Sequence, residues 1–115
     1  MEQNPVVKHP FGEATVVQLA ASGVESIDIQ NDLTLLDGAT VQATGARTVN
    51  LNIAPDLKVG ARLVILHKTA ATETLTPGTG MKGKAITGVA GKTFATEYFY
   101  NGTDFIQLAT ALQID

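Results

Sequence analysis

The sequence predicts an all-β protein: a small antiparallel β-sandwich or barrel of jelly-roll type with an extended N-terminal arm. Three observations lead to this fold class. Short runs rich in β-branched residues recur along the chain, turn signals separate them at intervals of roughly 8–12 residues, and helix signals are almost absent. A chain of 115 residues is long enough for one domain with a modest core. We therefore expect an arm over residues 1–13 and a single β domain over residues 14–115.

A hairpin near the end of the chain gives the strongest local signal. Residues 92–109 read KTFATEYFYNGTDFIQLA, with Asn101 and Gly102 between two runs of β-forming residues. Asn and Gly tolerate the positive φ values of tight hairpin turns, so this dipeptide predicts a strand, a turn and a returning strand.

The aromatic side chains of this hairpin alternate between its two faces. Phe99 lies between Tyr98 and Tyr100 in the sequence, so it must point to the opposite side of the strand. A hairpin with aromatic groups on both faces is poorly suited to having one face in water. We therefore predict self-association through Phe99, Tyr98 and Tyr100, with one face of the hairpin meeting the core and the other meeting a second subunit.

The remaining strands are expected between turn residues along the rest of the domain. The run at 47–53 alternates cleanly and places Val49, Leu51 and Ile53 inward. The run at 61–68 is the most apolar and is predicted to be central. We expect the other strands at residues 14–20, 24–29, 32–38, 39–44, 72–76 and 85–89.

The first thirteen residues contain two prolines and a glycine, which favour an extended segment over a helix. Two interpretations are open: a disordered terminus, or a docking arm that becomes ordered on a partner. Val6, Val7 and Phe11 would give a docking arm apolar groups to bury, and they are the predicted partner-binding residues of this segment.

Composition excludes several classes of protein. The net charge is −3 and only 17% of residues are charged, which argues against a nucleic-acid binder. There is no Cys for disulfides or thiolate metal sites, and no apolar run long enough to span a membrane. No secretion signal is recognised, so we expect synthesis in a cytoplasm.

No motif in the sequence predicts catalysis, a cofactor or a metal ion. Residues 78–83 match G-x-G-x-x-G, but the β-branched residues that follow oppose the helix that a dinucleotide site requires. Asp28, Asn31 and Asp32 flank one turn, where such residues commonly form the turn itself. We expect a protein that is not an enzyme, with no catalytic, cofactor-binding or metal-binding residues.

The second half of the chain resembles the small β-structured modules of virion proteins in tailed bacteriophages. The similarity extends over about residues 46–110 and rests on RTVNLNIAPDLKVGARLVILHK, the TLTPGTGMKG turn region and KTFATEYFYNGTDFIQLA. These modules occur in head fibres, capsid decoration proteins and tail-fibre domains. The resemblance implies a non-enzymatic virion component that forms a homo-oligomer, with a trimer favoured.

On this interpretation the arm binds the major capsid protein or another virion protein, and the β domain contacts further copies. The protein would be made in the host cytoplasm and reside in the virion, with no nucleic acid or membrane as partner. The alternative is a ligand-binding β module, either carbohydrate-binding or adhesin-like, such as the receptor-binding domain of a tail fibre. Such a module would use Tyr98, Tyr100 and Phe105 as a stacking platform.

Overall fold

The computed structural model describes residues 14–115, and these residues form strands without any helix. The all-β prediction is confirmed. The strands are β1 (Ala14–Gln18), β2 (Gly23–Ile29), β3 (Leu33–Ala43), β4 (Arg47–Ile53), β5 (Arg62–Thr69), β6 (Thr74–Pro77), β7 (Met81–Lys82), β8 (Ile86–Thr87), β9 (Thr93–Tyr100), β10 (Phe105–Gln107) and β11 (Leu112–Gln113).

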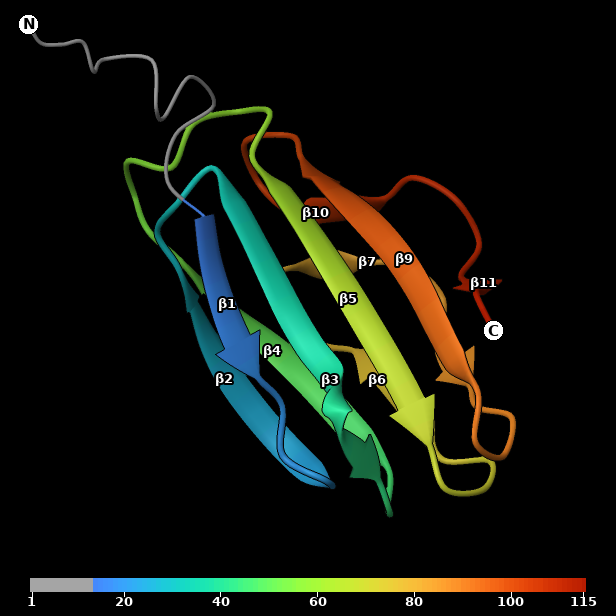
Figure 1. Cartoon of the computed structure of the whole chain (residues 1–115). Coiled ribbons are helices and arrows are strands. Elements are labelled where there is room, and N and C mark those ends of the chain that lie inside the picture. Colours follow the sequence, from blue (N-terminus) through green and yellow to red (C-terminus); the bar gives the residue numbers. More distant parts are fainter. Residues whose placement is uncertain (1–13) are drawn as a thin grey trace, which may run out of the picture.

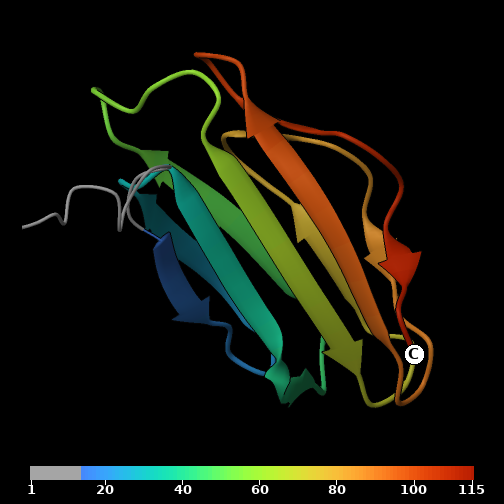
Figure 2. The same cartoon turned by 45° about the horizontal axis from the view of Figure 1, so that its top comes forward.

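Two sheets pack face to face, as Figures 1 and 2 show. The large sheet has the order β1-β3-β5-β9-β10-β7, with β11 also paired to β9. The small sheet has the order β2-β4-β6-β8. The most apolar strand, β5, lies in the interior of the large sheet between β3 and β9, as its composition predicted.

The first six strands alternate between the two sheets, so the chain winds as a two-sheet coil over residues 14–77. Within the large sheet β1, β3 and β5 are parallel, and within the small sheet β2, β4 and β6 are parallel. Antiparallel pairing is found where β5 meets β9, β9 meets β10 and β11, and β6 meets β8. The sheets are therefore mixed, which corrects the purely antiparallel sandwich expected from the sequence.

Alternation of polar and apolar residues indicates that one face of a strand is buried, but it does not indicate whether neighbouring strands run parallel or antiparallel. Each short turn of the coil carries the chain across to the opposite sheet instead of folding it back as a hairpin. The strands expected at 32–38 and 39–44 are one strand, β3, with a register shift between Gly38 and Ala43. There the Asp37 carboxylate accepts hydrogen bonds from the backbone N–H groups of Ala39 and Thr40.

The hairpin predicted around Asn101 is confirmed as β9 and β10. Tyr100 pairs with Phe105, so four residues form the connecting loop. The Asn101 side-chain oxygen accepts from the backbone N–H groups of Thr103 and Asp104, and Gly102 has a φ of 101°. Gly102 thus has the positive φ expected of it, whereas Asn101 stabilises the loop through its side-chain oxygen.

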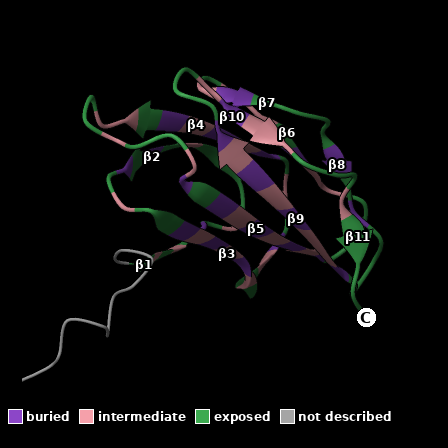
Figure 3. Ribbon diagram, turned by 90° about the horizontal axis from the view of Figure 1, so that it is seen from above, coloured by how far each residue is buried: buried purple, intermediate pink, exposed green. Residues whose placement is uncertain are grey.

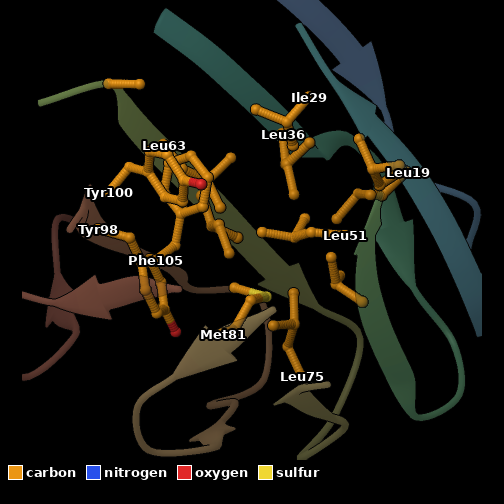
Figure 4. Packing of buried hydrophobic residues seen from close by; sticks show 14 of the residues in the cluster. Leu19, Ile29, Leu36, Leu51, Leu63, Leu75, Met81, Tyr98, Tyr100 and Phe105 are labelled. Carbon is orange, nitrogen blue, oxygen red and sulfur yellow. The ribbon is translucent and has the colours of Figure 1, made fainter. Parts of the chain in front are cut away.

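The core lies between the two sheets (Figure 4). Figure 3 shows buried and half-buried bands alternating along β9, because successive residues point to opposite faces of the sheet. The rings of Tyr100 and Phe105 stack with centroids 5.0 Å apart at the β10 end of this core. Its fully buried apolar side chains include Leu19, Ile29, Leu36, Val49, Leu63, Ile65, Leu75, Tyr98 and Phe105.

The predicted arm at residues 1–13 lies outside the described residues. The same holds for its expected partner-binding side chains, Val6, Val7 and Phe11.

Candidate functional site

The outer face of the large sheet carries an unusual amount of apolar surface. We call it the apolar face and define it by seven side chains. Four strand pairings place them together: β1 with β3, β3 with β5, β5 with β9, and β9 with β10. They are Val16, Leu33, Leu35, Val64, Leu66, Phe99 and Ile106.

The register of the strands arranges six of these side chains in two rows, and Leu66 lies outside them, paired with Asp37 and Ala95. In one row Val16 pairs with Leu35, and Leu35 pairs with Val64. In the other row Arg62 separates Leu33 from Phe99, and Phe99 pairs with Ile106. Side chains directly opposite each other in a sheet point to the same face, so each row forms a contiguous strip across the strands.

A groove adjoins this face where the C-terminal segment passes β9. Its volume is about 510 Å³, and Leu108 and Leu112 on its rim are 53% and 67% exposed. The groove is lined by Val64, Ala95, Thr96, Glu97, Leu108, Ala109, Thr110 and Leu112. No aromatic ring lines it, so it does not offer the stacking surface on which carbohydrate-binding sites rely.

The outer face of the small sheet has the opposite character. Apart from Val24, the side chains that point outward along β2, β4 and β6 are hydroxyls, amides and one carboxylate. Two of them bond to each other, since the Asn52 amide donates to the Asp28 carboxylate over 3.2 Å. We call this surface the polar face: Ser26, Asp28, Thr48, Asn50, Asn52 and Thr76. The two outer faces of the sandwich thus differ sharply in chemistry.

The structure separates the three predicted self-association residues. Phe99 lies half-buried on the apolar face, between Arg62 and Ile106. Tyr98 and Tyr100 point the other way and are 0% and 7% exposed in this chain's own core. Burial raises the pKa of Tyr98 to about 12. The self-association prediction is therefore corrected for these two tyrosines, because their rings are buried within this chain and cannot meet a second subunit.

The same geometry removes the predicted stacking platform. Tyr98, Tyr100 and Phe105 all lie in the core, so none of their rings is available to a sugar. Of the large aromatic side chains in the hairpin, Phe99 is the one that the apolar face presents.

A buried polar cluster lies at the end of the coil opposite the Asn101 loop. The Arg47 guanidinium is 2% exposed and donates to three backbone carbonyls: Ala20 over 2.8 Å, Gly38 over 2.8 Å and Val41 over 2.6 Å. Its Nη1 atom also lies 3.3 Å from His67 Nδ1. One side chain from β4 thereby connects the β1–β2 turn, the irregular part of β3 and strand β5.

Arginine has only donors, so the Nδ1 atom of His67 must accept from Arg47. The Nε2–H of His67 then donates to the Glu73 carbonyl over 3.0 Å. Both ring nitrogens are satisfied by the neutral imidazole. Burial is the main cause that lowers the pKa of His67. The hydrogen bond to the Glu73 carbonyl opposes this effect, and the charge of Arg47 adds a smaller lowering of the same pKa.

This arrangement predicts a loss of stability in mild acid. Unfolded His67 titrates near its ordinary value of 6.5 and folded His67 titrates lower, so the unfolded state binds the extra proton. The stabilisation is complete above pH 6.5 and is lost as the pH falls from there towards the folded pKa. Between pH 7.5 and pH 5.0 we expect the free energy of unfolding to fall by up to about 2 kcal/mol.

Urea denaturation at the two pH values measures this effect, with His67→Gln as the comparison. The Gln amide can still donate to the Glu73 carbonyl but does not titrate, so its stability should change less over the same interval. Equal pH dependence in the two proteins would show that other groups are responsible.

The sequence pattern already indicates that Arg47 and His67 point inward. Arg47 is in phase with Val49 and Leu51, and His67 is in phase with Leu63 and Ile65. A charged or titratable residue in the inward phase of a strand indicates a buried polar contact. Neither residue was assigned this role from the sequence, because the apolar positions alone define the strand.

The other sequence candidates have structural roles. Gly78 donates its N–H to the Val49 carbonyl, and a Cβ there would lie 2.0 Å from the Asn50 amide oxygen, which accepts from the Thr79 N–H. The glycine-rich segment therefore packs closely on β4. Asp28 bonds Asn52, and Asn31 donates to the Thr15 hydroxyl. Over residues 14–115 no three His, Cys, Asp or Glu side chains gather as a metal site would require.

Within the same range, no helix is long and apolar enough to cross a membrane. No protein-family model matches this chain, and comparisons with curated proteins and with solved structures find no match. The protein is thus defined by its class, an all-β two-sheet domain with one apolar and one polar outer face.

Proposed function

We propose that this chain is a non-enzymatic structural component of a phage virion, of the capsid decoration or head-fibre type. In this role it attaches to the capsid and assembles with copies of itself. The contrast between the apolar face and the polar face carries the proposal, because a protein that binds other subunits needs one surface to bury and another to keep in water.

Two further features support a role in assembly. The similarity to phage virion modules over residues 46–110 includes β4, β5 and β9, and the last two supply three side chains of the apolar face. The core also contains few aromatic residues, and aromatic residues make up 5% of the sequence. A domain with a small core gains stability when a partner covers additional apolar surface.

The proposed attachment to the capsid uses the N-terminal arm. Its apolar side chains, Val6, Val7 and Phe11, would bury themselves on the major capsid protein or another virion protein. We expect deletion of residues 2–12 to abolish attachment to the particle and to leave the β domain folded, because the domain's core lies within residues 14–115.

The measurement is the amount of protein that sediments with purified particles, for the full chain and for the deletion variant. Circular dichroism and thermal unfolding of the variant serve as the folding control. A triple substitution of Val6, Val7 and Phe11 with Ser keeps the length of the arm and should lose attachment as well. Undiminished attachment of the deletion variant would contradict the role of the arm.

A further inference from the structure

We propose that the apolar face binds the same face of a second copy of this chain, so that two large sheets pack against each other in a dimer. The inference rests on the self-assembly part of the proposed function and names the surface and the partner. Of the two outer faces of the sandwich, only the apolar face of a second copy offers an apolar surface for this face to contact.

Pairing with the polar face would be unfavourable. The hydroxyl and amide groups of Thr48, Asn50 and Thr76 would lose water there without gaining partners from Val64 or Leu35. Between two apolar faces, by contrast, Leu35, Val64 and Phe99 would all leave water against apolar atoms. Removal of these apolar side chains from water favours association through the hydrophobic effect.

The charges on the apolar face also favour a second copy. Arg62 and Glu97 form an ion pair of 2.6 Å within the face. Asp37, Lys68 and Asp115 lie near the other end of the strands, so the face holds groups of both signs. A surface of mixed charge attracts neither a strongly acidic nor a strongly basic partner, but it is complementary to itself when one copy is turned relative to the other.

The size of the face is adequate for a stable contact. The strands β1, β3, β5, β9 and β10 span roughly 20 Å at a spacing of about 4.8 Å, and seven residues of strand extend for about 23 Å. The projected area is on the order of 500 Å², and side-chain relief increases the accessible area. Leu108 and Leu112 extend the apolar surface beyond β9. A standard interface takes about 800 Å² from each partner, so the contact would use the whole face together with Leu108 and Leu112.

A contact between identical patches closes after two copies, because each patch is then fully occupied. The inference therefore assigns a dimer to this surface, in place of the trimer that the resemblance implies. In that dimer Val64, on the interior strand β5, would lie near the two-fold axis, and Phe99 would be the largest side chain in the contact.

Light scattering on the whole chain tests the inference. We expect twice the mass of the 12.0 kDa chain. Phe99→Asp places an unpaired carboxylate in the contact and should weaken self-association at least about 100-fold, so that the mass falls to that of one chain. Thr76→Asp is the matched control on the polar face and should leave the mass unchanged. Thermal unfolding establishes that both variants fold.

Crosslinking gives a second readout if Phe99→Asp does not fold. The chain has no Cys, so a single introduced thiol is unique in each copy. Val64→Cys should give a covalent dimer with a short bismaleimide reagent, whereas Thr76→Cys on the polar face should not.

The inference is overturned by a monomeric wild-type protein, by a trimer, or by equal crosslinking of the two Cys variants. It can fail separately from the proposed function. A monomer that attaches to particles would remove the dimer and keep the virion role, whereas a dimer that never attaches would remove the virion role and keep the dimer.

Discussion

Replacement of Arg47 with Met is expected to lower the free energy of unfolding by about 3–5 kcal/mol, as is typical when one member of a buried polar cluster is removed. The guanidinium is buried and donates to the carbonyls of Ala20, Gly38 and Val41. Met fills a similar volume but donates no hydrogen bond, so these acceptors lose their partner in a site with little access to water. His67 Nδ1 loses its donor as well.

Urea denaturation of the variant measures the loss, at a protein concentration low enough for the chain to be monomeric, and Arg62→Met is the matched control. Arg62 pairs with Glu97 at the surface, where side-chain exposures are 54% and 38%. An exposed ion pair of this kind contributes at most about 1 kcal/mol. If both variants lose the same free energy of unfolding, the buried hydrogen bonds of Arg47 stabilise the fold no more than an exposed ion pair does.

Gly38→Ala is expected to destabilise the fold by about 3 kcal/mol, at the upper end of the usual cost of overpacking. A Cβ at this position would lie 2.4 Å from the Leu66 carbonyl oxygen and 2.6 Å from Arg47 Nη1. The first of these atoms belongs to the backbone of β5, in the interior of the large sheet, and cannot move without disturbing that sheet. The second donates to the Gly38 carbonyl itself.

Gly91→Ala is the comparison that separates two causes of destabilisation, the lack of space for a Cβ and an unfavourable backbone conformation. Gly91 has a φ of 73°, but nothing lies within 4 Å of a Cβ built there. Its replacement should cost about 1 kcal/mol for the left-handed conformation alone. Thermal or urea unfolding of the two variants gives the comparison, and a Gly38→Ala protein as stable as Gly91→Ala would show that β5 adjusts readily.

Local features of the fold were accessible from the sequence because they depend on neighbouring residues. The Asn101 turn, the strand at 47–53 and the interior position of β5 follow from turn chemistry and alternation. The path of the chain between the sheets was not accessible in this way. A turn such as that between β2 and β3 has the same polar composition whether it reverses the chain within one sheet or carries it to the other.

The candidate site was predictable in part. The alternation of aromatic residues correctly placed Phe99 on the face opposite Tyr98 and Tyr100, but it could not decide which face was inside. That choice depends on how the rest of the chain packs around the tyrosines and buries them. The apolar face as a whole needs the register of β1, β3, β5 and β9, which joins residues from distant parts of the sequence.

The two-sheet coil also determines when the chain can begin to fold. Ala14 pairs with Leu33, and Leu33 pairs with Arg62, so neighbouring strands of a sheet are separated by the strand that lies opposite. Within the described residues, β9 and β10 are the only consecutive strands that pair with each other, and they come near the end of the chain. Closing a long loop costs chain entropy before the contacts between its ends stabilise the chain. We therefore expect folding to take milliseconds to seconds. During synthesis, this hairpin would leave the ribosome only after the whole coil has emerged.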